Sequence, residues 1–104
     1  MTAPRKIAAF ALAAAASSAH AQDASALYVR SLAATCASCH GTDGRTAAGA
    51  PIAPLAGMPR EYLVAQLQAF KAGTRPSTIM TQLAKGYTDP QIEQLATYFA
   101  AQKK

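Results

Sequence analysis

The sequence predicts an all-α domain. Two segments carry apolar side chains at the spacing of a buried helix face: Leu63, Leu67 and Phe70 in one, and Ile92, Leu95, Ala96 and Phe99 in the other. No run of β-branched residues has the alternation of a strand. Because each apolar face must be buried, we expect the first and last helices of the chain to pack against each other.

The first 21 residues resemble a cleavable export signal. Arg5 and Lys6 form a basic start, residues 7–16 are apolar, and Ala19-His20-Ala21 fits a cleavage site between small residues. The apolar stretch is too short to cross a bilayer, so a retained membrane anchor is the less favoured alternative. We expect a leader over residues 1–21 and one mature domain over residues 22–104, with no stable membrane insertion after cleavage.

The mature chain is expected to begin with a helix and continue into a loop. Asp23 fits the N-cap of a helix that runs to about Ala34. Glycine and proline are frequent from Gly41 to Met58, which predicts irregular structure there. A long loop in a small domain usually has a functional cause, and covering a cofactor is one such cause.

Two more helices and a short segment follow. Pro59 fits near the first turn of the second helix, which Gly73 ends. A short segment over residues 78–85 is expected to be capped by Gly86. Thr88, with Gln91 three residues later, forms a capping box for the last helix.

The run Cys36-Ala37-Ser38-Cys39-His40 carries the clearest chemistry. A C-x-x-C pair followed directly by histidine has the spacing that attaches a c-type haem. Each thiol can form a thioether with a haem vinyl group, and the imidazole of His40 can then bind the iron as the proximal ligand. Haem of this type is attached outside the bacterial cytoplasm, so the motif and the leader together predict a periplasmic protein.

Other interpretations of the motif fit less well. A thioredoxin-type pair needs a βαβ setting, which the sequence lacks. A structural zinc site needs four ligands, whereas the whole chain has two cysteines and two histidines, of which His20 lies in the leader. A disulfide between Cys36 and Cys39 is possible but would leave His40 without a role.

Haem would also supply material for the core. Cleavage of the leader leaves 83 residues, and chains of this size often need a cofactor or cross-link for stability. The sequence has no tryptophan, so a flat apolar macrocycle would add the missing buried area. We therefore expect the polypeptide to fold poorly without haem.

The charge of the mature chain is mild. Without Arg5 and Lys6, the basic residues exceed the acidic ones by three, and they are scattered along the sequence. This pattern does not favour nucleic acid as a partner. Lys71, Arg75 and Lys85 could contribute to a positive docking rim, although an ordinary solvated surface is the simpler interpretation.

The second axial ligand cannot be chosen from physical arguments on the sequence alone. Removal of His20 with the leader leaves His40 as the single histidine, which excludes a second histidine ligand from the same chain. The candidates are Met58 and Met80, followed by Lys71, Lys85 or an open site. A methionine in a small core is more often packing than a ligand, so both remain possible at this stage.

The mature chain resembles the class I c-type cytochromes of the small bacterial c553/c4 kind over nearly all of its length. The matching elements are Cys36-Ala-Ser-Cys-His40-Gly41, Leu55-Ala-Gly57, residues 62–75, Met80 with Leu83-Ala84, and Ile92 to Phe99. The resemblance implies a cytochrome c fold with terminal helices packed around a single covalently bound haem c that has one edge near the surface. It also implies that Met80 is the distal ligand, since Met58 lies where other members often carry a polar residue.

Two shorter segments are similar to the cytochrome subunit of flavocytochrome c sulfide dehydrogenases. They are residues 75–80 and residues 85–88. This similarity implies a sulfide-oxidising flavoprotein as the partner that reduces the haem. Some members of that group carry two haem motifs, whereas this chain has one.

Together these observations predict a periplasmic electron carrier that exchanges single electrons with redox proteins and is not itself an enzyme. Within the same chemistry, the alternative is a dedicated subunit of a flavin dehydrogenase. A haem sensor or peroxidase is a third possibility, and it would require an open sixth position on the iron.

Overall fold

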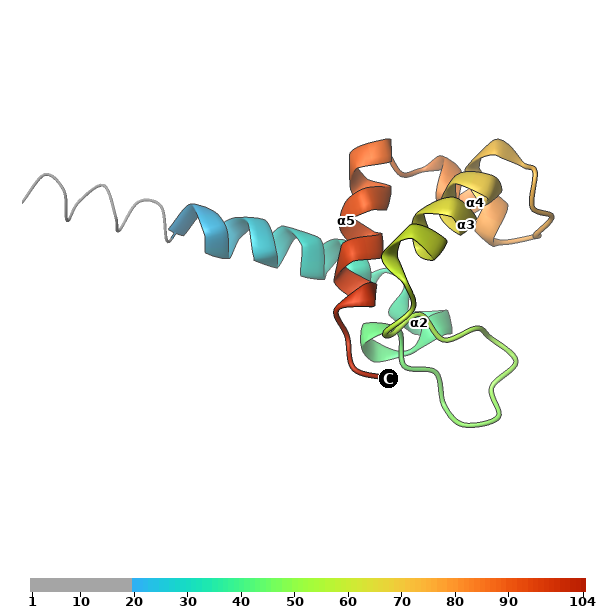
Figure 1. Cartoon of the computed structure of the whole chain (residues 1–104), viewed down its shortest axis with the longest axis horizontal. Helices are drawn as coiled ribbons and strands as arrows, with labels where there is room; N and C mark the ends of the chain where they lie inside the picture. Colours follow the sequence, from blue (N-terminus) through green and yellow to red (C-terminus); the bar gives the residue numbers. More distant parts are fainter. Residues whose placement is uncertain (1–19) are drawn as a thin grey trace, which may run out of the picture.

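The computed structural model describes residues 20–104, and this part of the chain is built from helices and loops without strands. Helical residues 20–34 are followed by α2 (Ala37–His40), the short 3₁₀ helix η1 (Thr42–Gly44), α3 (Arg60–Ala72), α4 (Met80–Lys85) and α5 (Asp89–Ala100) (Figure 1). The predicted all-α fold class is confirmed. Of the predicted leader, residues 1–19 lie outside the described residues.

The terminal helices meet in the core, as the sequence predicts. Ala33 of the N-terminal helix belongs to one buried cluster with Leu63 of α3 and with Leu95, Ala96 and Phe99 of α5. All four residues of the predicted α5 stripe are buried, because Ile92 is also inaccessible. On α3, by contrast, Leu63 is buried while Leu67 and Phe70 are only half-buried.

The predicted start of the N-terminal helix is wrong. The chain is already helical at residue 20, so Asp23 lies inside the helix and is not its N-cap. The residues before Asp23 are Ala21 and Gln22, which are compatible with a helix and give it no reason to begin later. The predicted end at Ala34 agrees with the structure, which turns at residues 35–36 before α2.

The other helices begin and end where their capping residues predict, with one exception. Gly73 ends α3 in the left-handed conformation and donates its N–H toward the carbonyls of the last turn. Thr88 and Gln91 form the predicted capping box at the start of α5. Gly86 does follow α4, but its φ of −78° is right-handed, so it does not cap this helix in the way that glycine usually does.

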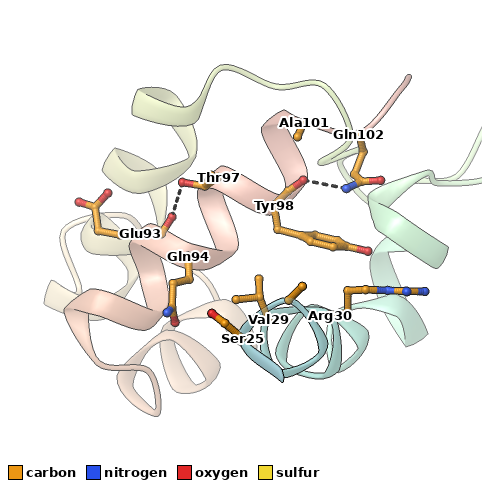
Figure 2. Close-up of a pocket in the computed structure, with 10 residues that line it drawn as sticks. Ser25, Val29, Arg30, Glu93, Gln94, Thr97, Tyr98, Ala101 and Gln102 are labelled. Carbon is orange, nitrogen blue, oxygen red and sulfur yellow. Dashed lines mark hydrogen bonds between the residues drawn. The ribbon is translucent and has the colours of Figure 1, made fainter. Parts of the chain in front are cut away.

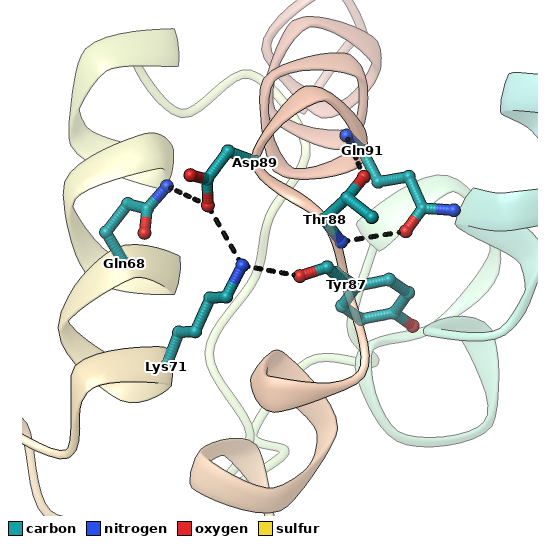
Figure 3. A network of polar contacts seen from close by, with 6 residues as sticks. All are labelled: Gln68, Lys71, Tyr87, Thr88, Asp89 and Gln91. Atoms are coloured by element: carbon teal, nitrogen blue, oxygen red, sulfur yellow. Dashed lines mark hydrogen bonds and ion pairs between the residues drawn. The ribbon is translucent and has the colours of Figure 1, made fainter.

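A polar network holds the connection between α4 and α5 against α3 (Figure 3). The ammonium group of Lys71 donates to the carbonyl of Tyr87 at 2.8 Å and to Asp89 Oδ1 at 2.9 Å. Gln68 donates to the same carboxylate oxygen at 3.2 Å. The donors of Lys71 and Gln68 lower the pKa of Asp89.

The loop after the C-x-x-C-H motif is hydrogen-bonded to α5. The carbonyl of Gly44 accepts hydrogen bonds from the N–H groups of Leu55 and Ala56, and Gly57 donates to the carbonyl of Phe99 at 2.9 Å. Gly44 is buried with a φ of +77°, and a β-carbon there would lie 2.8 Å from Leu55 Cβ and 2.9 Å from Phe99 Cδ1. Only glycine combines this conformation with so close an approach.

Gly44→Ala should therefore destabilise the protein strongly. The substitution combines left-handed backbone strain with overpacking, for a loss of about 3 kcal/mol in the free energy of unfolding. Gly49→Ala is the matched control, because Gly49 has the same φ of +77° but nothing within 4 Å of the added carbon. Its loss should be about 1 kcal/mol. Equal losses in denaturant titrations of the two variants would contradict the packing around Gly44.

Asp89→Asn should change how stability depends on pH. A carboxyl whose pKa is lowered in the folded state stabilises it above the unfolded pKa, and this contribution disappears as the pH falls through the folded pKa. The variant should thus be less stable than wild type near neutrality, and the difference should shrink between about pH 5 and about pH 2. The effect should be modest because both partners are partly solvated.

Thermal unfolding across this pH range measures the difference between the two proteins. Glu61→Gln serves as a control. The carboxylate of Glu61 also lies near a basic side chain, 3.7 Å from Arg60, but it is exposed. A deficit of the Asp89→Asn protein that stays constant with pH would show that the carboxylate of Asp89 gains nothing from Lys71.

Candidate haem site

The motif lies at the turn into α2, and its three reactive side chains share one side of that turn of helix. Cys36 is the N-cap of α2, while Cys39 and His40 lie three and four residues later. These spacings bring side chains to the same helix face. The two thiols are free, so the disulfide alternative is not formed. Cys36 is half-buried and Cys39 is exposed, and burial raises the pKa of the Cys36 thiol.

The ring of His40 is oriented by the loop that follows the motif. Its Nδ1 atom lies 2.7 Å from the carbonyl oxygen of Ala53. A carbonyl can only accept, so Nδ1 is the donor, and in the neutral ring this tautomer leaves the lone pair of Nε2 free for a metal. Such an outer hydrogen bond is the usual way to fix the orientation of a ligating imidazole. The sequence did not identify Ala53, because a backbone carbonyl leaves no signature in residue type.

Met58 is used for packing. It contacts the buried core cluster, and its N–H donates to the carbonyl of Leu55 at 3.2 Å. Its side chain also lines a pocket of about 210 Å³ beside Lys104 at the C-terminus. The adjacent Gly57 is hydrogen-bonded to α5, which holds this part of the loop against the last helix.

Met80 occupies a different environment. It is the first residue of α4, it is half-buried, and it is not among the side chains packed on the main core cluster. Its N–H donates to the hydroxyl of Ser77 at 3.1 Å, which fixes the backbone where α4 begins. Of the two methionines, Met80 is thus the one whose thioether the core does not use.

The lysines and the arginine of the predicted docking rim are less free than the sequence indicated. Lys71 is bound to Tyr87 and Asp89, so it is available neither as an iron ligand nor as a mobile surface charge. The guanidinium of Arg75 hydrogen-bonds Gln66 and lies 4.6 Å from the centroid of the Phe70 ring. Arg75 and Lys85 are both exposed, and of the three only Lys85 has no side-chain bond within residues 20–104.

Large apolar side chains next to Met80 in the sequence, on α3 and in the loop before α3 are left uncovered by the polypeptide. Ile79 and Leu83 on either side of Met80 are 60% and 49% exposed, Tyr62 on α3 is 46% exposed, and Ile52 in the loop is 39% exposed. The segments before α4 and between η1 and α3 lie on the same side of the molecule, away from the N-terminal helix (Figure 1). A flat apolar macrocycle anchored at Cys36 and Cys39 would remove such surface from water. The residues present therefore fit haem.

A zinc centre has no comparable support. Among residues 20–104, no three His, Cys, Asp or Glu side chains come close enough together to hold a metal ion. Within the same residues, no helix is both long and apolar enough to cross a lipid bilayer.

An open groove of about 560 Å³ lies elsewhere, between the N-terminal helix and α5 (Figure 2). Its lining includes Val29, Arg30 and Tyr98 but no cysteine, histidine or methionine, so it lacks the groups that haem needs. The Tyr98 hydroxyl donates to Asp43, and this bond raises the pKa of Tyr98. Since Tyr87 also has a protein partner in Thr35, neither hydroxyl is left free for a haem propionate.

Comparisons with known proteins agree with this geometry. The family model for cytochrome c matches residues 21–103. The chain is 44% identical over 68 residues to the cytochrome subunit of sulfide dehydrogenase from Chlorobaculum tepidum, covering 65% of this chain and 60% of the relative. It is 38% identical over 73 residues to cytochrome c-554(548) of Halomonas halodenitrificans, covering 66% of this chain and 86% of the relative.

A solved structure supports the same assignment. Cytochrome c4 from Acidithiobacillus ferrooxidans superimposes with a TM-score of 0.60 at 41% identity, covering 64% of this chain and 37% of that one. The chain thus spans less than two thirds of the length of the Chlorobaculum tepidum relative and of the cytochrome c4 structure.

The family match, the C-x-x-C-H motif and the fitting surroundings identify covalently bound haem c as the cofactor. The chain belongs to the cytochrome c family.

Proposed function

We propose that this protein is a periplasmic mono-haem electron carrier, in which Cys36 and Cys39 hold the haem and His40 and Met80 bind the iron. The observation that carries the proposal is the bond from His40 Nδ1 to the Ala53 carbonyl, which leaves Nε2 as the ligand atom. When bound, the haem supplies an iron that alternates between the ferric and ferrous states. The chain supplies ligation, burial and docking, and it makes or breaks no substrate bond.

Met80 is the proposed distal ligand because its thioether is free of the core while Met58 packs into it. A sulfur ligand opposite histidine favours ferrous iron and raises the reduction potential. Two filled axial positions suit electron transfer, whereas gas binding or peroxidase chemistry needs an open one. The haem sensor or peroxidase is therefore the less favoured function.

The location and the domain boundary are part of the proposal. We propose that residues 1–21 are removed after export and that residues 22–104 form the working domain in the periplasm. The basic and apolar pattern of the first 21 residues supports the leader. Thioether attachment at Cys36 and Cys39 also requires an exported chain.

Redox proteins are the expected partners, and one more specific assignment has support. The Chlorobaculum tepidum relative is named a subunit of sulfide dehydrogenase, and residues 75–80 and 85–88 resemble that group. This favours, as a second candidate, a dedicated subunit that takes electrons from a sulfide-oxidising flavoprotein. Co-purification of a flavoprotein in a one-to-one ratio from the native source would support the subunit function. Recovery of a free monomer would support the electron-carrier function.

The axial assignment predicts opposite results for the two methionines. Met80→Ala should abolish the weak ferric near-infrared band of iron–methionine sulfur, lower the reduction potential and allow the ferrous protein to bind carbon monoxide. Met58→Ala should keep the band and the potential but lose about 2 kcal/mol of stability through a cavity in the core.

Spectra and potentials of the two holoproteins separate the alternatives. Loss of the band in Met58→Ala but not in Met80→Ala would reverse the assignment. A wild-type ferrous protein that already binds carbon monoxide readily would instead support the open-site function.

A further inference from the structure

Tyr87 is bound at three points in the turn between α4 and α5. Its N–H donates to the carbonyl of Ala84 at 3.2 Å, and its own carbonyl accepts from Lys71 at 2.8 Å (Figure 3). Its hydroxyl lies 2.9 Å from Thr35 Oγ1, on the segment between the N-terminal helix and α2. One residue thus connects α4, α3 and the segment that leads into the haem motif.

The direction of the hydroxyl bond follows from the partners of Thr35. Thr35 Oγ1 donates its single proton to the carbonyl of Leu32 at 2.7 Å. In its contact with Tyr87 it can therefore only accept, so Tyr87 is the donor. The backbone beside Thr35 is also held in place, because Cys36, the next residue, donates its N–H to the carbonyl of Ala33 at 3.1 Å.

One end of this contact adjoins a residue that holds the haem in the proposed function, and the other end is joined to the helix that begins with Met80. Thr35 precedes Cys36, and its oxygen lies 3.9 Å from Cys36 Sγ. At the other end, Tyr87 is joined to α4 through Ala84, which is completely buried. Because α4 spans only Met80–Lys85, fixing its end restrains its beginning at Met80.

We propose that Tyr87 is a positioning residue that holds Met80 in place relative to the haem motif through the bond of its hydroxyl to Thr35. This inference rests on the proposed function, because it takes Met80 as the distal ligand. The bond opposes the movement of α4 that would release the methionine sulfur. Its loss makes Met80 easier to displace by an external ligand.

Tyr87→Phe isolates the effect, because it removes the hydroxyl and keeps the ring that packs against the core. Thr35→Val removes the acceptor from the other side. Tyr28→Phe is the matched control, since the Tyr28 hydroxyl also bonds a side chain on another helix, accepting from Gln91 Nε2 at 2.9 Å. That bond joins the N-terminal helix to α5 and involves neither α4 nor the motif.

The experiment is an imidazole titration of the ferric holoproteins at one pH, followed by loss of the iron–methionine near-infrared band. Tyr87→Phe and Thr35→Val should each bind imidazole about threefold to tenfold more tightly than wild type. The double variant should be no more sensitive than Thr35→Val alone, since Thr35→Val already removes the bond to Tyr87. Tyr28→Phe should match wild type in this titration even where its stability falls.

Two results would overturn the proposal in distinguishable ways. Equal imidazole affinities of Tyr87→Phe, Tyr28→Phe and wild type, with the band present in all three, would show that Tyr87 has only a packing role and would leave the proposed function intact. Absence of the band in the wild-type ferric protein would contradict Met80 ligation itself, and with it both proposals.

Discussion

The polypeptide of this cytochrome leaves several of its large apolar side chains exposed, and the rest of the structure depends on that constraint. Of the eight apolar residues buried in the described part, four are alanines, and the largest side chains that are fully buried are Ile92 and Leu95. Large apolar groups such as Ile79 and Leu83 meanwhile remain exposed beside Met80. Haem is thus both the redox group and the missing part of the core.

The small polypeptide core organises the groups that receive the haem. Phe99 contributes to the buried cluster through its ring, while its carbonyl holds Gly57 in the loop after the motif. The same loop presents the Ala53 carbonyl to His40. Helix α5, which packs against the N-terminal helix, therefore also fixes the segment that orients the imidazole of His40, the proposed proximal ligand. One helix thus couples the packing of the core to the orientation of the His40 ring.

Local patterns made much of this fold predictable. The stripe on α5, the capping box of Thr88 and Gln91, and the glycine that ends α3 act within a few residues of each other, so their sequence spacing is sufficient. The C-x-x-C-H motif is equally local. The same reasoning placed the start of the N-terminal helix wrongly at Asp23, because a residue that can cap a helix can also lie within one.

Long-range contacts were not predictable from the sequence. The bond from His40 to the Ala53 carbonyl and the pairing of Tyr87 with Thr35 join residues far apart in the chain. Lys71 looked like a surface charge, yet it bridges Tyr87 and Asp89. The periodicity of Leu67 and Phe70 predicted a buried face, but these side chains stay half-buried because the polypeptide alone does not cover them.

The most direct test of this account is to compare the thermal unfolding of residues 22–104 with and without attached haem, followed by circular dichroism. We predict a cooperative transition for the holoprotein, and low helix content with no cooperative transition for the chain made without haem. A haem-free chain that unfolds cooperatively from a fully helical state would show that the polypeptide core is sufficient and would contradict the account.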